Sequence, residues 1–162
     1  MSFLRSVAKE ALDHVVSVTK YLCCLHIVNT YACTLTLVSG PSMLPTLNLT
    51  GDLLLVERVS HKMGKVRPGD VVLVKSPVEP RKNLAKRVIA LEGDKVTSFM
   101  DPLTNDQCKT IVVVPGGHVW IQGDNLYASR DSRHYGPVPY GLIQGKVFCR
   151  LWPLDSFGSL DK

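Results

Sequence analysis

Glycine–aspartate pairs that stand beside short apolar runs are the feature of this sequence that most restricts its fold. The pairs are Gly51-Asp52, Gly69-Asp70, Gly93-Asp94 and Gly123-Asp124. The apolar runs cover residues 53–56, 71–74, 84–91, 112–114, 118–122, 142–143 and 146–151. Glycine supplies backbone angles that other residues avoid and aspartate hydrogen-bonds its own backbone, so each pair indicates a turn. Short apolar runs between turns are typical of β-strands, and the sequence therefore predicts one mostly β domain over residues 39–155.

The N-terminal part of the chain has a different pattern. Apolar residues recur at helical spacing over residues 3–19, which predicts an amphipathic arm over residues 1–20. Residues 21–38 carry no formal charge, and this length is near the lower limit for crossing a bilayer core. A buried core helix has the same composition, but the position between a charged arm and a folded domain favours a transmembrane helix. Residues 156–162 are expected to form a frayed C-terminal tail.

Basic residues flank only the N-terminal side of the apolar stretch. Arg5, Lys9 and Lys20 precede it, and the next lysine or arginine is Arg58. Because positive charge is retained on the inner side of a membrane, we expect the N-terminus inside and residues 39–162 outside. The stretch leads into a Gly-Pro pair rather than a small-residue cleavage site, so it does not resemble a cleaved secretory signal.

Charge and cysteine content argue against several kinds of function. The formal net charge is +5, but lysine and arginine are scattered without a basic run, so nucleic acid is not an expected partner. The five cysteines show no C-x-x-C pair, and neither a zinc site nor a disulfide framework is predicted. A Cys108–Cys149 bridge remains open. No metal or other cofactor is expected.

Ser42 is the first candidate for chemistry. Gly40, Pro41 and Pro45 restrict the backbone around its hydroxyl, and a serine nucleophile needs such a rigid presentation. Taken alone, the stretch fits an ordinary turn serine better. The short connection from the apolar stretch to Ser42 covers at most ~14 Å when fully extended, which predicts Ser42 close to the membrane surface.

A nucleophilic serine needs a general base, and Lys86 is the main candidate. Its run is apolar on both faces, so Lys86 or its neighbour Arg87 must be partly desolvated. Desolvation lowers the pKa of a lysine and makes the neutral amine available, whereas a guanidinium keeps its proton. A lysine that reaches water from a strand edge explains the run at least as well. The histidines have no evident partner and fit surface or structural roles: His14, His26, His61, His118 and His134.

A polar segment after residues 118–122 offers supporting groups. Ser129 can hydrogen-bond a neutral lysine amine and hold it in place, and Asp131 with Arg133 can form a supporting pair. A solvated loop with an incidental ion pair fits the same residues.

Taken in order, these segments resemble the type I signal peptidase family. The matching motifs are Ser42-Met43-Leu44-Pro45-Thr46, Gly51-Asp52, Lys86-Arg87-Val88 with Glu92-Gly93-Asp94, and Gly123-Asp124-Asn125 followed by Ser129-Arg130-Asp131-Ser132-Arg133. One motif is weak evidence, but four in order across residues 40–145 are strong. The resemblance implies a mostly β, signal-peptidase-like domain behind an N-terminal helix. The roles it implies are nucleophile for Ser42, general base for Lys86, lysine orientation for Ser129, and structural support for Asp131 and Arg133.

Within this family, the short length and residues 134–139 resemble the mitochondrial inner membrane protease branch in its subunit 1-like form. That resemblance implies a single-pass protein of the inner membrane whose catalytic domain faces the intermembrane space. It implies precursor polypeptides as substrates, from which sorting peptides are removed, and a second, related subunit as partner. Some bacterial members place a hydroxyl residue two positions before the nucleophile to bind the oxyanion. Gly40 stands there in this chain, so the Ser42 backbone N–H is expected as one donor and the other is unassigned.

Two functions of other classes fit parts of the sequence. A catalytically silent membrane subunit could support a partner enzyme, but all four motifs retain their polar residues. A soluble self-cleaving, repressor-like β domain also uses a Ser-Lys dyad, but the apolar residues 21–38 and the lack of a helix-turn-helix arm argue against it.

Overall fold

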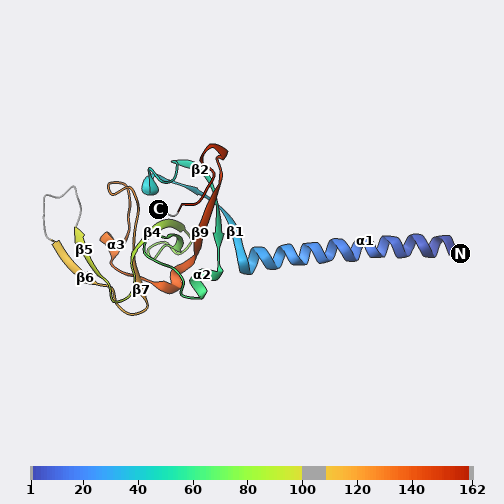
Figure 1. Ribbon diagram of the computed structural model, residues 1–162, viewed down its shortest axis with the longest axis horizontal. Helices are drawn as coiled ribbons and strands as arrows, with labels where there is room; N and C mark the ends of the chain where they lie inside the picture. Colours follow the sequence, from blue (N-terminus) through green and yellow to red (C-terminus); the bar gives the residue numbers. More distant parts are fainter. Residues whose placement is uncertain (1, 100–108, 161–162) are drawn as a thin grey trace.

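A long N-terminal helix leads into a mostly β domain in the computed structural model, which describes residues 2–99 and 109–160 (Figure 1). The helix α1, Ser2–Ile27, continues without a break into a π-helical segment, Val28–Ala32. Residues Lys9–Ala32 are long and apolar enough to cross a membrane, and none of this window is buried against the domain. The large apolar side chains described on α1 are exposed, which is costly in water. The alternative of a buried core helix is therefore wrong.

The predicted transmembrane helix over residues 21–38 ends too late. Cys33–Ser39 forms strand β1, which pairs antiparallel with β2, Thr50–Glu57. Leucines 35 and 37 alternate with threonines in this segment, and a period of two suits a strand rather than a helix. Strand β1 also separates the helix from Ser42 by roughly 20 Å at ~3.3 Å per residue. The short connection expected between the membrane helix and Ser42 is therefore absent.

Seven of the described strands form one large antiparallel sheet in the order β1-β2-β9-β3-β4-β7-β8. The further strands of this sheet are β3 Val71–Lys75, β4 Asn83–Ala90, β7 His118–Gln122, β8 Val138–Pro139 and β9 Ile143–Trp152. A separate hairpin consists of β5, Lys95–Phe99, and β6, Lys109–Val113. It lies at the end of the domain opposite α1 (Figure 1).

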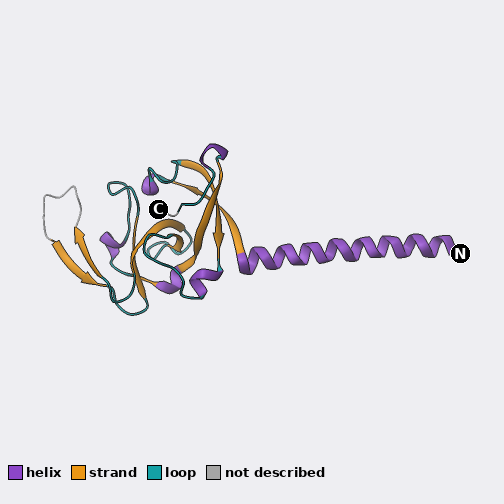
Figure 2. Cartoon of the chain, viewed as in Figure 1, coloured by secondary structure: helices purple, strands orange, loops and turns teal. Residues whose placement is uncertain are grey.

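Short helical turns connect the strands, so the domain is mostly strand and loop (Figure 2). They are η2 Pro41–Met43, α2 Val59–Lys62, α3 Ser132–Tyr135, η3 Tyr140–Leu142 and η4 Leu154–Ser156. The predicted mostly β fold is confirmed. The two C-terminal runs, predicted separately, are one strand, β9. Gly145 joins them because a β-carbon there would lie 2.4 Å from the Glu57 carbonyl oxygen, so only glycine fits this close strand pairing.

Residues 156–160 are part of the domain, although the sequence predicts a frayed tail over residues 156–162, of which 161 and 162 lie outside the described residues. Arg150 and Gly158 exchange two backbone hydrogen bonds. Leu160 is buried in the same apolar cluster as Met43 and Leu47. These contacts order the segment that follows β9. Of the two cysteines of the possible Cys108–Cys149 bridge, Cys108 lies outside the described residues. Cys149 is a free thiol.

Candidate active site

Ser42 lies in a loop that several contacts hold in one shape. This Ser42 loop, residues 40–49, is closed at its base by a hydrogen bond from the Gly40 N–H to the Leu49 carbonyl at 2.7 Å. Gly40 has φ 121°, an angle that side-chain-bearing residues rarely adopt. Met43 and Leu47 are buried in the core on either side of the loop. Ser42 itself is half-buried in the turn η2, so its hydroxyl is held near the surface of the domain.

The far end of the Ser42 loop is tied to a partly buried ion pair. Arg87 donates from Nε and Nη2 to the two carboxylate oxygens of Asp124, at 2.8 and 2.7 Å. Thr46 donates its hydroxyl proton to the same carboxylate, and Arg87 also donates to the Gly69 carbonyl at 2.7 Å. This pair links the Ser42 loop, strand β4 and the segment after β7. The sequence alone assigns no role to Thr46 or Asp124, because their contact with Arg87 depends on the fold.

Lys86 is buried inside the domain, with 2% of its surface exposed. It lies on β4 opposite Val72 of β3, and its Nζ donates a hydrogen bond to Ser129 Oγ at 2.8 Å. Burial lowers the pKa of Lys86 from 10.5 to about 8; Asp131 opposes this shift, Arg133 adds to it and Asp124 opposes it. A neutral amine is therefore accessible near physiological pH, as desolvation of a lysine predicts. The alternative of a lysine reaching water from a strand edge is wrong.

Ser129 is held from its other side by Asp131. The Ser129 hydroxyl donates to Asp131 Oδ2 at 2.7 Å while it accepts from Lys86. The Asp131 carboxylate has no exposed surface, and it also accepts from Arg133 Nε and Nη2 at 2.9 and 2.8 Å. Burial raises the pKa of Asp131, but the hydrogen bonds from Arg133, Ser129 and the Gly123 N–H together have the larger, opposite effect. The pKa of this carboxyl is therefore lowered from its usual value. An ionised carboxylate thus fixes the direction of the Ser129 hydroxyl.

Local capping explains why this polar segment folds as it does. Asp131 is the N-cap of α3, and a capping box joins its side chain and backbone to the third helical residue, His134. Ser132 Oγ accepts the N–H of Ile121 at 3.0 Å, which fastens α3 to β7. His134 therefore has a structural role, in line with the interpretation of the histidines from the sequence. The interpretation of this segment as a merely solvated loop is wrong, because Ser129, Asp131 and Ser132 are all buried.

Gly123 brings the Ser42 loop and the lysine site together. A β-carbon on Gly123 would lie 2.3 Å from both Ser129 Oγ and the Ser42 carbonyl oxygen. The Asn125 N–H donates to the same carbonyl at 3.1 Å. Ser42 and Ser129 are thus neighbours across one glycine. The fold brings all five predicted site residues to this region, and among the described hydrogen bonds Lys86 Nζ is joined to Ser129 rather than to Ser42.

A pocket of about 300 Å³ opens beside Ser42. Its walls come from residues 36–39 of β1, from the Ser42 loop, from Leu73 and from residues 83–85 of β4. Strand β1 is the outermost strand of the sheet, and β7 pairs with β4 from Arg87 onward. The pocket is therefore flanked by stretches of β1 and β4 that each have a strand on one side. Among the described residues, no group of three or more His, Cys, Asp or Glu side chains gathers as a metal site would.

Comparisons with known proteins agree with these features. The family described as signal peptidase, peptidase S26, matches residues 11–107 and 97–152. A relative from Arabidopsis thaliana, mitochondrial ATP-independent inner membrane protease subunit 1a, is 58% identical over 96% of this chain and 92% of its own length. Mitochondrial inner membrane protease subunit 1 of Mus musculus is 43% identical over 97% of this chain and 92% of its own. The match to a crystal structure of a signal peptidase I from Enterococcus faecalis V583 covers 51% of this chain and 96% of the solved chain, with 23% identity and a TM-score of 0.41.

Proposed function

The chain belongs to the signal peptidase family, peptidase S26, and we propose that Ser42 and Lys86 are the nucleophile and general base of its peptidase activity. It is a serine endopeptidase of the mitochondrial inner membrane that removes sorting peptides from precursor proteins. The observation that carries the assignment of the site is the buried Lys86 amine, held by Ser129 next to the Ser42 loop. A lysine without exposure, with a lowered pKa, suits proton transfer rather than surface charge.

The reaction proceeds in two stages. Neutral Lys86 accepts the Ser42 hydroxyl proton as Ser42 Oγ attacks the scissile carbonyl carbon. The tetrahedral intermediate collapses to an acyl-enzyme, and the leaving amine takes the proton from the Lys86 ammonium. A water molecule then gives a proton to Lys86 and attacks the acyl carbon, which releases the new carboxyl end and restores the Ser42 hydroxyl.

Ser129, Asp131 and Arg133 support this lysine. Ser129 accepts a hydrogen bond from the amine, which limits the directions that Nζ can take. Asp131 accepts a hydrogen bond from the Ser129 hydroxyl and is itself held by two hydrogen bonds from the Arg133 guanidinium. The Ser42 backbone N–H is the proposed oxyanion donor of this loop. The Gly40 N–H is bonded to Leu49 and is not available for that task.

We propose that the substrate binds as an extended segment beside Ser42. The pocket lies between stretches of β1 and β4, so an added strand can form backbone hydrogen bonds there. The pocket itself takes a side chain of the segment. Such binding requires the chain around the cleaved bond to be extended and free of stable structure.

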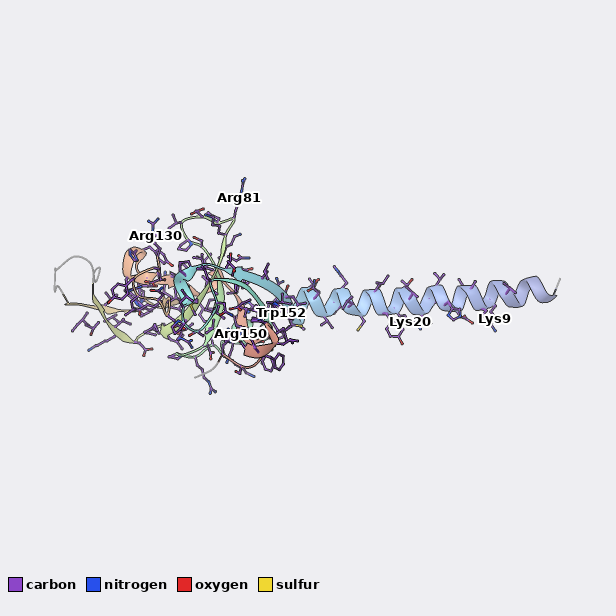
Figure 3. The ribbon with its side chains drawn as sticks, turned by 90° about the horizontal axis from the view of Figure 1, so that it is seen from above. Lys9, Lys20, Arg81, Arg130, Arg150 and Trp152 are labelled. Atoms are coloured by element: carbon purple, nitrogen blue, oxygen red, sulfur yellow. The ribbon has the colours of Figure 1, made fainter. Side chains whose placement is uncertain are left out.

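An exposed apolar row on strands β1, β2 and β9 supports a position against the outer surface of the membrane. Leu37 of β1 lies opposite Leu53 of β2, which lies opposite Trp152 of β9. Directly opposed residues share a face of the sheet, and Leu37 and Trp152 are 70% and 54% exposed. Trp152 is labelled on the side of the domain toward α1 (Figure 3). We propose that Leu37, Leu53 and Trp152, which we call the leucine–tryptophan row, rest on the lipid.

The length of the helix agrees with contact between the domain and the outer membrane surface. From Lys20, the last charged residue of α1, to Ala32 the helix rises about 18 Å at 1.5 Å per residue. That is less than the ~30 Å of a hydrocarbon core. The Lys20 side chain can extend toward the inner membrane surface. At the outer surface, the exposed leucine–tryptophan row can enter the hydrocarbon core and make up for part of the missing helix length. The N-terminus then lies inside and the peptidase domain in the intermembrane space, as the basic residues of the arm predict.

We further propose that the chain works with a second, related protease subunit as a heterodimer. The relatives described above are named as subunits of a protease, which supports an assembly of more than one chain. Copurification of a second peptidase S26 chain from mild detergent would support the proposal, whereas a fully active preparation of this chain alone would contradict it.

The experiment that tests the function is cleavage of precursor proteins by membranes that carry wild type or Ser42→Ala. We expect new N-termini, identified by sequencing, with wild type and not with Ser42→Ala. Ser60→Ala, which removes a hydroxyl on α2 outside the described site, is the matched control and should cleave normally. Equal cleavage by wild type and Ser42→Ala would overturn the assignment of the nucleophile.

A further inference from the structure

The segment after β9 is fastened to that strand rather than free. We refer to residues 153–160 as the C-terminal strap. Arg150 pairs with Gly158 through backbone hydrogen bonds of 2.8 and 3.1 Å in both directions. The Arg150 side chain also donates from Nε to the Ser156 carbonyl at 2.7 Å. One residue of β9 thus holds the strap at two points.

The same guanidinium reaches the Ser42 loop with its Nη1 nitrogen. Arg150 Nη1 donates to the Thr46 carbonyl at 3.1 Å and lies 3.6 Å from Asp52 Oδ2. Asp52 is fully buried and also accepts from the backbone N–H and the side-chain amide of Asn48, at 2.6 and 2.9 Å. Arg150 therefore connects the strap to Thr46 of the Ser42 loop and to Asp52 of β2.

The strap and the loop also share one apolar cluster. Leu160 is 7% exposed and belongs to the buried cluster that contains Met43 and Leu47. Met43 directly follows Ser42, and Leu47 directly follows Thr46. Leu160 thus occupies the core space beneath the loop, and its contact is independent of the Arg150 hydrogen bonds.

From these contacts we propose that Arg150 and Leu160 are positioning residues for Ser42, and that the C-terminal strap is part of the peptidase machinery. The proposal rests on the assignment of Ser42 as nucleophile. Thr46 is the point of connection, because its carbonyl binds Arg150 while its hydroxyl binds the Asp124–Arg87 pair next to Lys86. The strap therefore sets the Ser42 loop against the strand that carries the base.

The test compares Leu160→Ala and Arg150→Lys with wild type in the full-length protein in detergent micelles, on a soluble peptide that spans a cleaved precursor junction. Misplacement of a reacting group by about 1 Å can cost about 10²-fold in rate. We expect kcat to fall about 10- to 100-fold in both variants, with KM within about threefold of wild type. The midpoint of the acid limb should not move, because neither side chain contacts Lys86. Leu160→Met, which refills the space, should restore kcat.

A matched control separates positioning from loss of stability. Val96 is also 7% exposed, but it belongs to a different cluster around Trp120. Val96→Ala should lower the melting temperature and leave kcat unchanged. If Leu160→Ala and Arg150→Lys kept wild-type kcat, or if kcat fell equally in Val96→Ala, the proposal would be overturned. Failure of the nucleophile assignment is distinguishable, since Ser42→Ala would then still cleave the peptide.

A second readout remains if Leu160→Ala does not fold. Arg150→Lys keeps the charge beside Asp52 but cannot donate to both carbonyls as the planar fork does. Its acylation by a serine-directed probe should be slowed by the same factor as kcat. Acylation of Ser42 in Arg150→Lys at the wild-type rate would contradict a positioning role.

Discussion

Lys86 Nζ lies 2.8 Å from Ser129 Oγ, and both side chains are buried. The hydroxyl can accept from the lysine because its own proton is directed to Asp131 at 2.7 Å. The lysine is thus held by an uncharged group, and burial keeps its pKa low. A direct ion pair with a carboxylate would instead favour the ammonium form. This arrangement is what makes a buried lysine usable as a base.

Replacement of the base tests that interpretation. Lys86→Met keeps an unbranched apolar side chain in the buried site and removes the amine, so cleavage should fall about 10²- to 10⁴-fold, the range for loss of a general base. Circular dichroism should show a folded protein. Lys82→Met, at an exposed position that pairs with Glu79, is the control and should cleave at the wild-type rate. Wild-type activity in Lys86→Met, with a loss in His118→Ala, would assign the base to the histidine.

The pH profile should report Lys86. Because the proposed base acts as the neutral amine and the pKa of Lys86 is about 8, kcat/KM should fall about tenfold per pH unit below that value. Rates on a soluble peptide from pH 6 to 9 would measure the limb. A rate that stays flat between pH 6 and 8 would contradict the role of Lys86.

The same shift has a consequence for stability. The pKa of Lys86 is lower in the folded state than the usual 10.5, so between about pH 8 and 10.5 the unfolded chain binds more protons. The contribution of Lys86 to folding therefore becomes more favourable as pH rises through this window, and its cost is greatest below pH 8. Lys86→Met should raise the melting temperature more at pH 7 than at pH 10. An equal change at both pH values would show that the lysine is not desolvated.

Gly123 should tolerate no side chain. A methyl group there would meet Ser129 Oγ and the Ser42 carbonyl at 2.3 Å, so Gly123→Ala should separate the two serines and cost about 1–3 kcal/mol of stability through overpacking. Peptide cleavage and chemical denaturation measure the two effects. Gly116→Ala is the matched control, since nothing lies within 4 Å of its added β-carbon. Normal cleavage by Gly123→Ala would mean that the contact between the loops is not needed.

Tryptophan fluorescence can test whether the leucine–tryptophan row contacts the lipid, because the chain has two tryptophans. Trp152 is 54% exposed and Trp120 is 2% exposed. In vesicles with bromine-labelled acyl chains, the protein should be quenched through Trp152. Quenching should disappear in Trp152→Phe and persist in Trp120→Phe. Equal quenching in wild type and Trp152→Phe would place the leucine–tryptophan row away from the lipid.

Much of the fold could be predicted from local sequence patterns. The Gly-Asp turns and apolar runs located strands β2, β3, β4 and β7, since these depend on residues close in sequence. The end of the membrane helix could not be predicted in the same way. Residues 33–38 are apolar enough for a span, and their pairing with β2 is what makes them a strand. The frayed tail was expected because chain ends are commonly poorly ordered, and the anchor of residues 153–160 at Arg150 lies outside any local pattern.

The sequence by itself determined the family, the mostly β class and the five residues of the predicted site, because four short motifs keep their order and residue types. Only the tertiary structure decided how these groups meet. Thr46 and Arg150 are 104 residues apart and share one hydrogen bond, and Ser42 meets Ser129 across Gly123. Such contacts follow from strand order and register, which bring distant segments together. The burial that lowers the pKa of Lys86 arises in the same way, from neighbours that are remote along the chain.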